Sequence, residues 1–232
     1  MSGSNGGGST EPLAGAGADL WDERAERYRT SAVHAGGPDL DLVVAWCDAG
    51  PGTTVLDVAT GGGHVARRLR DLGAQVVTVD RSPGMQPDVI APAEHLPFAD
   101  RSFDVVVNRL AAHHFDSIPE AVAEFARVAD KRVVIEDHRY TDDATEQAEK
   151  LRDPSHVRSL SEDGWRELLT AARLEVERVA FHDMTLEFEE WLDRTDTPAA
   201  DRPRIRELLA PLASEDGSTW ESTMVIIQAR KP

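Results

Sequence analysis

VLDVATGGGHVA, the stretch at residues 55–66, joins a continuous apolar run to three glycines and then to a helical pattern. The apolar run predicts a strand buried on both faces, as in a parallel sheet. The glycines allow a tight turn and a close approach to a ligand, and the helix that follows offers unpaired N–H groups. This order predicts an α/β fold with a ligand-binding loop at the carboxyl end of its first strand.

Short apolar runs and helical patterns alternate along the rest of the chain, which indicates a doubly wound sheet with helices on both faces. The last two strands flank two helical segments, so we expect seven strands, mostly parallel, with an antiparallel last strand. A single domain at 19–232, with N-terminal helices and a helical insertion at about 185–215, follows a flexible Gly/Ser-rich tail at 1–18. The predicted strands are 53–58, 75–79, 88–91, 103–108, 132–136, 174–182 and 224–229, and the predicted helices are 20–29, 39–47, 65–72, 118–128, 160–172, 187–193 and 202–212.

The composition favours a small molecule or a protein as partner. The chain has 25 Lys and Arg against 42 Asp and Glu, a formal net charge of −17, and such a surface repels nucleic acid and anionic membranes. No apolar run reaches the roughly 18 residues that span a bilayer, and the first ten residues lack the features of a secretory signal. The lone cysteine, Cys47, lies in an apolar run and is expected to be a buried core residue. We expect a cytoplasmic protein, either monomer or homodimer.

Two acidic residues end the first two predicted strands, and they indicate the ligand. Asp80 suits a ribose diol. Gly61, Gly63 and Ala66 also match the dinucleotide pattern G-x-G-x-x-A, which alone is a weak signal. Asp57, four residues before Gly61, would repel a pyrophosphate but attract a ligand that carries an ammonium and a sulfonium, such as S-adenosylmethionine. The alternative for Asp57 is a turn or capping residue.

Four segments in order carry a resemblance to a known family: VLDVATGGG, VTVDRSPGM, AEHLPFADRSFDVVVNRLAAHHF and LRDPSHVR. From about Trp21 to the C-terminus the chain resembles the class I S-adenosylmethionine-dependent methyltransferases. The similarity lies with the branch that includes quinone-biosynthesis C-methyltransferases and many small-molecule enzymes. It implies a Rossmann-like fold, S-adenosyl-L-methionine as cofactor and S-adenosyl-L-homocysteine as product.

The resemblance implies cofactor-binding roles for residues that match the motifs. Asp57 would bind the methionine ammonium, and Gly61 and Gly63 would let the loop pass under the methionine part. Asp80 would accept hydrogen bonds from the ribose hydroxyls, with Arg81 beside it.

The resemblance also implies which residues would contact the adenine and the methyl group. Met85 would pack on the adenine, and Ala93 and Glu94 would lie beside it. Asn108, at the end of the fourth strand, would line the methyl end.

The chain departs from the family pattern near the adenine. Pro92 stands where relatives often carry an aspartate that touches the adenine amino group. Only thirteen residues, 81–93, separate Asp80 from Glu94, so the helix that relatives place there is expected to be missing. The Pro-Gly-Gly turn before the fifth strand is also replaced, by ADKR at 129–132. We expect a more open adenine pocket and weaker cofactor binding.

Histidines gather at the predicted strand ends, where ligands of an open α/β sheet bind. Methyl transfer needs a base only if the nucleophile must lose a proton, and histidine suits that role. We name His113 and His138 as candidate bases, the alternative for His113 being a shaping role in the His-His-Phe turn. The remaining candidates for the site are His64, Arg109, His114 and Asp137. Their spacings match no metal motif, so we expect no metal.

The segment LRDPSHVR and several aromatic residues are candidates for acceptor contacts. Arg152 and Asp153 are interpreted as an ion pair that fixes a loop, with substrate contacts from Arg152, His156 or Arg158 as the alternative. A lid for an apolar acceptor could use the aromatic side chains of Trp21, Tyr28, Trp191 and Trp220.

The predicted function is methyl transfer from S-adenosylmethionine to a small-molecule acceptor, at carbon or at oxygen. One alternative is an enzyme of the same fold that catalyses cyclisation or decarboxylation. A non-catalytic binding module is a second, and a nicotinamide-dependent oxidoreductase is a third, against which Asp57 argues.

Overall fold

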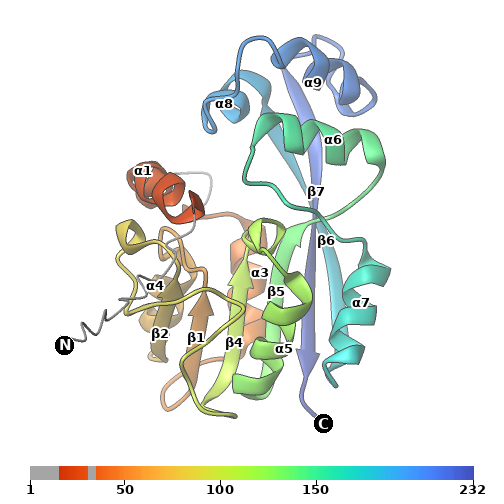
Figure 1. Cartoon of the computed structure of the whole chain (residues 1–232). Helices are drawn as coiled ribbons and strands as arrows, with labels where there is room; N and C mark the ends of the chain where they lie inside the picture. Colours follow the sequence, from red (N-terminus) through yellow and green to blue (C-terminus); the bar gives the residue numbers. More distant parts are fainter. Residues whose placement is uncertain (1–15, 31–34) are drawn as a thin grey trace, which may run out of the picture.

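Strand β1 and its neighbours form the centre of the computed structural model, which describes residues 16–30 and 35–232 (Figure 1). Across those residues the sheet has seven strands in the order β3-β2-β1-β4-β5-β7-β6. β7 is antiparallel to β5 and to β6, and the other neighbours are parallel. This confirms the predicted doubly wound, mostly parallel sheet with an antiparallel last strand. The strands are β1 (Thr54–Val58), β2 (Gln75–Asp80), β3 (Val89–Ile90), β4 (Phe103–Arg109), β5 (Ala129–His138), β6 (Glu175–Glu187) and β7 (Thr219–Arg230).

Helices cover both faces of this sheet and extend beyond one end of it (Figure 1). The α-helices are α1 (Ala16–Thr30), α3 (Pro38–Cys47), α4 (His64–Asp71), α5 (Ile118–Val128), α6 (Asp143–Arg152), α7 (Glu162–Ala171), α8 (Phe188–Asp193) and α9 (Arg202–Leu208). Three short 3₁₀ helices are η1 (Pro83–Met85), η2 (Ala112–His114) and η3 (Ala210–Leu212). The predicted tail lies outside the described residues as far as residue 15, and α1 begins at Ala16.

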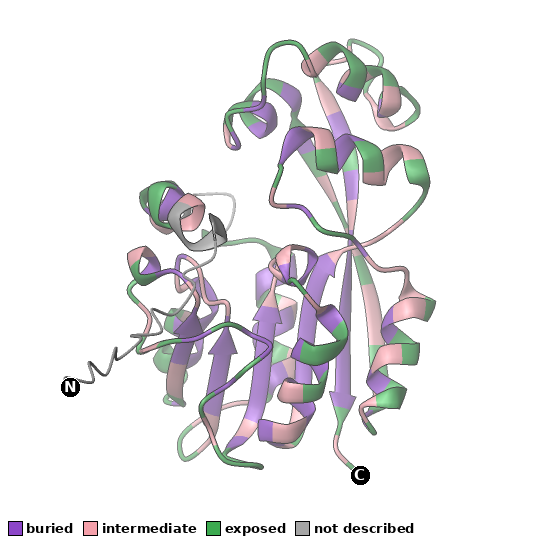
Figure 2. Cartoon of the chain, in the orientation of Figure 1, coloured by how far each residue is buried: buried purple, intermediate pink, exposed green. Residues whose placement is uncertain are grey.

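The two faces of the sheet belong to two separate cores, because successive side chains of a strand point to opposite faces. Val55 of β1 packs with residues of α3 and α4, whereas Leu56 and Val58 pack with residues of α5 and α7. Cys47 lies in the α3 core and is fully buried, as predicted. Figure 2 shows the resulting burial of the central strands. Continuous apolar strands are therefore explained by helices on both sides.

A third core lies beyond the carboxyl ends of the parallel strands, in what we call the upper unit. It comprises α6, α8, α9, η3 and the adjoining ends of β6 and β7 (Figure 1). Its apolar residues are Ala148, Leu186, Phe188, Trp191, Leu192, Ile205, Leu209 and Trp220. The helical insertion predicted at about 185–215 supplies α8, α9 and η3 to this unit.

Four elements differ clearly from the sequence-based prediction. Helix α6 was not predicted, because its sequence DATEQAEKLR is mostly polar and buries only a narrow side. β6 and β7 extend five residues past their predicted ends near 182 and 224, since residues 183–187 and 219–223 pair with each other above the sheet. β5 begins at Ala129 rather than at 132. Between Asp80 and Glu94 the structure has only η1 and β3, in agreement with the missing helix.

Helix α1 lies across the carboxyl ends of the first strands and contacts both parts of the molecule (Figure 1). Its Asp22 accepts a hydrogen bond from the Gly84 backbone N–H at 2.7 Å, next to η1. Its Arg24 donates to both carboxylate oxygens of Asp153 at 3.1 Å, and both side chains are buried. The helix is thereby held above the loops that follow β1, β2 and β4.

Candidate active site

The loop after β1 has the conformation that its glycines predict. Gly61 and Gly63 have φ values of +50° and +71°, which disfavour residues with a Cβ. The Thr60 backbone N–H donates to Val79 O at 3.0 Å, which ties the loop to β2. Gly63 is the N-cap residue of α4 and has no side chain to cap it. The loop therefore presents backbone and the start of α4 to the space beyond β1.

Asp57 and Asp80 flank this loop from neighbouring strands. Asp80 accepts hydrogen bonds from the N–H groups of Gly61 at 2.9 Å and Ser82 at 3.0 Å. Asp57 accepts from the Thr60 hydroxyl at 2.7 Å. Burial raises the pKa of Asp57 to about 6, and burial also raises the pKa of Asp80. Two buried carboxylates with raised pKa values at one cavity favour a cationic or hydroxyl-rich ligand.

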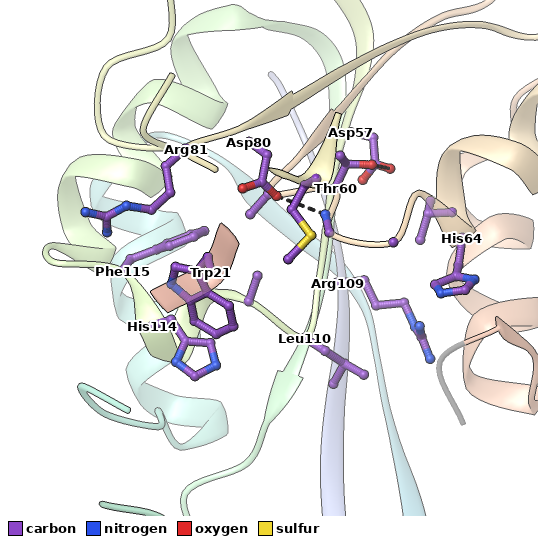
Figure 3. Close-up of a pocket in the computed structure, with 16 residues that line it drawn as sticks. Trp21, Asp57, Thr60, His64, Asp80, Arg81, Arg109, Leu110, His114 and Phe115 are labelled. Carbon is purple, nitrogen blue, oxygen red and sulfur yellow. Dashed lines mark hydrogen bonds between the residues drawn. The ribbon is translucent and has the colours of Figure 1, made fainter. Parts of the chain in front are cut away.

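A first cavity of about 830 Å³, counting its open mouth, lies between α1 and the loops after β1, β2 and β4 (Figure 3). Five predicted cofactor residues line it, namely Asp57, Gly61, Asp80, Arg81 and Met85. The aromatic side chains of Trp21, His114 and Phe115 lie together on the side opposite His64. The remaining lining residues are Ala59, Thr60, Gly62, Val65, Arg109, Leu110 and Ala111.

Four other predicted cofactor residues do not line the first cavity. Gly63 lies at the turn into α4. Ala93 is buried, and Glu94 accepts a hydrogen bond from the Ser117 N–H at 3.2 Å. The Asn108 amide donates to Val58 O at 2.9 Å, which fixes β4 to the end of β1. Their cofactor roles stay predictions, and in this structure their side chains shape the surrounding loops.

Several lining residues were not named from the sequence. Thr60, Leu110, Ala111 and Phe115 carry no charge, and although they lie inside the family motifs, no role was assigned to them. Leu110 and Ala111 directly follow β4, so the rule that ligands bind at strand ends is the signal that would have found them. Phe115 follows η2 and reaches the cavity only because that short helix turns the chain back.

A second cavity of about 540 Å³ adjoins the first, and Leu110 and His114 line both. It lies between the sheet and the upper unit. Its lining residues are Leu110, His113, His114, His138, Arg152, Asp153, Met184, Leu186, Trp191, Arg194 and Met224. Apolar side chains such as Met184 and Trp191 share this lining with histidines and charged groups, and such a mixed lining suits an organic molecule that carries polar groups.

The two candidate bases both lie at this second cavity. His113 Nδ1 hydrogen bonds with Asp137 Oδ1, and the His113 and His138 rings meet edge to face with centroids 4.7 Å apart. Burial, reinforced by His138 and His156, holds the pKa of His113 well below its usual value. Burial lowers the pKa of His138 as well, against the opposing effect of Glu149. Both rings are therefore neutral at neutral pH and able to accept a proton.

The predicted ion pair between Arg152 and Asp153 is wrong. Arg152 pairs with Glu149 at 3.2 Å and donates to Trp191 O, whereas Asp153 pairs with Arg24 of α1. Their side chains point to different partners because α6 ends at Arg152 and Asp153 starts the next turn. Asp153 thus connects α1 to the second cavity, which sequence spacing could not indicate.

Two of the four aromatic residues predicted to form a lid line a cavity, Trp21 the first and Trp191 the second. Trp191 and Trp220 are fully buried in the core of the upper unit, with ring centroids 4.6 Å apart. Trp21 does lie over the first cavity, edge-on to His114 at 4.6 Å between centroids. The Tyr28 side chain falls outside the described residues. His156 contacts Glu146 at 3.2 Å, and Arg158 is exposed.

A buried charge cluster supports the floor of the first cavity. Arg109 pairs with Asp39 of α3 and with Glu136 of β5, the latter at 2.6 Å. Burial alone would raise the pKa of Asp39, but Arg109 outweighs it and the pKa is lowered. Burial raises the pKa of Glu136 to about 8, to which the nearby Asp39 adds. The Arg109 guanidinium thus lies between two buried carboxyl groups and offsets their charge.

The chain matches known proteins over most of its length. A model of the methyltransferase domain matches residues 56–135. YcgJ, an uncharacterised methyltransferase of Bacillus subtilis, is 30% identical over 226 residues, which cover 88% of this chain and 89% of YcgJ. The chain belongs to the class I methyltransferases. This confirms the family that the four motifs predicted.

Two further similarities concern the branch of the family and the fold of this methyltransferase. A demethylmenaquinone methyltransferase of Renibacterium salmoninarum is 39% identical over 97 residues, covering 38% of this chain and 41% of that protein. It supports the predicted quinone-related branch. A candidate methyltransferase structure from Bacillus halodurans has a TM-score of 0.75 at 28% identity, covering 84% of this chain and 100% of that one.

Two kinds of feature are absent from the part of this methyltransferase that the structure describes. Across 16–30 and 35–232, no group of three or more His, Cys, Asp or Glu side chains has the arrangement of a metal site. Within the same ranges, no helix combines the length and the apolar character that crossing a membrane requires.

Proposed function

We propose that this methyltransferase binds S-adenosyl-L-methionine in the first cavity and transfers its methyl group to a small organic acceptor in the second. The observation that carries the proposal is the pair of buried carboxylates, Asp57 and Asp80, on either side of the Gly61 turn. Asp57 would bind the ammonium of the methionine part. Asp80 would accept hydrogen bonds from the ribose, and Met85 and Trp21 offer apolar surface to the adenine.

A structural neighbour supports this cofactor. A geranyl diphosphate C-methyltransferase from Streptomyces coelicolor, solved with S-adenosyl-L-homocysteine, shares the fold with a TM-score of 0.63 at 14% identity. When bound, S-adenosylmethionine supplies an activated methyl group on a sulfonium, so this chain's residues have only to align the acceptor and exclude water. Leu110 and His114, shared by both cavities, mark where the two reactants would meet.

His113 is the base that the geometry favours. Because its Nδ1 hydrogen bonds with Asp137, a neutral ring keeps its proton on that nitrogen and leaves Nε2 as acceptor. Asp137 is a positioning residue in this arrangement, since it fixes the ring and its tautomer. The His138 ring packs against the His113 ring and helps to hold it in place.

Calorimetric titration with S-adenosyl-L-homocysteine tests the cofactor. Asp57→Asn should weaken binding by roughly 10-fold to 100-fold, since hydrogen bonds to charged groups contribute about 1.5–3 kcal/mol. Asp100→Asn, at an exposed carboxylate away from both cavities, is the control and should bind as wild type. Unchanged binding by Asp57→Asn, or binding of NADH instead, would contradict the assignment. Incorporation of labelled methyl from S-adenosylmethionine into small molecules of a cell extract tests the transfer itself.

A further inference from the structure

A third cavity lies in the upper unit, between α6, the segment after β5 and the extended end of β7 (Figure 1). It holds about 420 Å³, counting its open mouth. None of the residues proposed to hold the methyl donor lines it, and His138 is the one described residue that it shares with the second cavity. Its wall consists mainly of hydroxyl, carboxylate and guanidinium side chains, and Leu212 alone among its described lining residues is purely apolar.

Three buried polar atoms at this wall have no hydrogen-bond partner among the described residues. They are Glu149 Oε1, Arg139 Nε and Trp220 Nε1. Glu149 and Trp220 are only 4% and 1% exposed. His138 Nδ1 lies 3.9 Å from Glu149 Oε1, which is beyond hydrogen-bond distance. Because buried polar groups are nearly always paired, these three atoms indicate that the third cavity receives a molecule that supplies their partners.

Two serine hydroxyls add to this set. Ser159 and Ser222 are both buried, line the third cavity and make no side-chain hydrogen bond within the described part of the chain. A hydroxyl can donate or accept, whereas the carboxylate of Glu149 accepts and the N–H groups of Arg139 and Trp220 donate. The third cavity therefore offers one acceptor, two donors and two hydroxyls that adapt to either role.

The charges around the third cavity favour a neutral ligand. The second carboxylate oxygen of Glu149 pairs with Arg152 at 3.2 Å, and Glu146 pairs with Lys150 at 3.1 Å. An ammonium would therefore gain little from either carboxylate, and the Arg139 guanidinium would repel it. A ligand carboxylate would face both glutamates of the wall. Burying an unpaired charge costs far more free energy than burying a neutral group that forms hydrogen bonds.

The third cavity continues the second along strand β7. Trp220, Ser222 and Met224 alternate along this strand and so lie on one face of it. Met224 lines the second cavity, and the other two residues line the third. His138, which is paired with Met224 in the sheet, lines both. A group bound in the third cavity would therefore lie next to the cavity proposed for the acceptor.

We propose that the third cavity binds a neutral amide-type group, such as a carboxamide, a urea or a lactam. Its N–H would donate to Glu149 Oε1, and its carbonyl oxygen would accept from Arg139 Nε and Trp220 Nε1. Such a group carries a donor and an acceptor side by side without a net charge, which is what the unpartnered atoms require. It belongs either to a free small molecule or to the polar end of the acceptor, and only the second source rests on the proposed methyl transfer.

NMR titration of the ¹⁵N-labelled full chain with acetamide tests the proposal at one atom. The indole N–H resonance of Trp220, identified by its loss in Trp220→Phe, should move along a saturating curve because Nε1 gains an acceptor. Trp165 is the internal control. Its Nε1 is also buried and unpartnered, but it lines none of the three cavities. The Trp165 resonance should stay in place.

Three probes of similar size test the charge of the ligand. Acetate, methylammonium and the zwitterion glycine should each bind more weakly than acetamide by about tenfold or more, because each must bury an ionised group. A third cavity that holds only water would give no saturable shift with acetamide, which would overturn the proposal. Binding of any of the charged probes as tightly as acetamide would overturn it as well.

Two substitutions test the wall itself. Glu149→Gln should weaken acetamide binding by about tenfold, since hydrogen bonds to charged groups are the stronger ones. Ser222→Ala, a smaller change, should weaken it by about twofold to tenfold. Glu207→Gln, at an exposed ion pair on α9, is the control and should bind as wild type. Wild-type affinity in both Glu149→Gln and Ser222→Ala would contradict the assignment, and an unmoved Trp165 resonance shows that each variant is folded.

Hexanamide distinguishes the two sources of the amide group. If the group is the polar end of the acceptor, hexanamide should bind about tenfold more tightly than acetamide, and Met224→Ala should remove that gain. Equal affinities of the two amides assign the site to a free small molecule, and the amide site stands in both cases. Saturating S-adenosyl-L-homocysteine, proposed to fill the first cavity, should displace neither amide. Failure of the cofactor proposal would therefore be recognised independently.

Discussion

At the scale of single residues, we expect Asp57 to decide how the binding of S-adenosyl-L-homocysteine depends on pH. Burial raises its pKa to about 6 in the unliganded protein, although the Thr60 hydroxyl and the Ala66 N–H oppose this. An ammonium binds the ionised carboxylate, so affinity should fall as the pH drops through about 6 and stay constant above it. Titrations with S-adenosyl-L-homocysteine between about pH 5 and pH 8 measure this dependence, with proton release near the midpoint. Asp57→Asn should show a flat profile, and a wild-type profile equally flat would contradict the prediction.

The residues that sequence reasoning could identify are those whose chemistry follows from the strand on which they lie. Asp57, Asp80 and Gly61 end or follow buried strands, and the structure brings them to one cavity. Glu94 and Asn108 lie near the ends of the strands as predicted, but their side chains make hydrogen bonds within the protein. The Glu94 carboxylate accepts from the Ser117 N–H, and the Asn108 amide donates to Val58 O. Such local hydrogen bonds depend on loop paths that composition and periodicity do not specify.

At the scale of elements, α1 should be the least firmly held part of the site. Arg24 connects it to Asp153 through a pair whose side chains are 5% and 2% exposed. Arg24→Ala leaves the buried Asp153 carboxylate without its cation. Removing one partner of a buried ion pair lowers the free energy of unfolding by about 3–5 kcal/mol. We expect faster hydrogen exchange in α1 and faster release of S-adenosyl-L-homocysteine, both measurable on the same variant.

Arg27 supplies the control on the same helix. It pairs with Asp196 at 2.8 Å, but the two side chains are 50% and 68% exposed. Exposed pairs contribute about 0–1 kcal/mol, so Arg27→Ala should leave exchange in α1 close to wild type. Equal effects of the two substitutions would show that the Asp153 pair does not hold the helix.

Elements with a strong apolar pattern were predictable, and polar elements were not. The strands at 75–79 and 103–108 lie within a residue of the prediction because each contains a continuous apolar run. Helix α5 agrees equally well because its apolar residues follow the period of one helix face. Helix α6 buries only Ala148, Glu149 and Arg152, which gives no such period. Its position depends on contacts with α9, about fifty residues later in the chain, and on the Arg152 pairing with Trp191 O.

At the scale of the whole molecule, we expect the upper unit and the sheet to unfold together. β6 and β7 pass through both, paired over their full length from Glu175 with Arg230 to Glu187 with Thr219. Trp220→Ala, in the core of the upper unit, should therefore lower the stability of the whole chain by about 3–5 kcal/mol. Urea unfolding followed by far-UV circular dichroism measures the loss, and two separate transitions would contradict the expected cooperativity.

The pairing of Glu187 with Thr219 has a consequence for how this protein can diversify. The intervening residues 188–218 leave the hairpin after Glu187 and rejoin it at Thr219. The pairing of β6 with β7 therefore does not depend on the length of this segment. Closing a longer excursion costs little conformational entropy. Lineages can thus exchange this segment above His113 and His138 and recognise new compounds, while Asp57 and Asp80 stay in place.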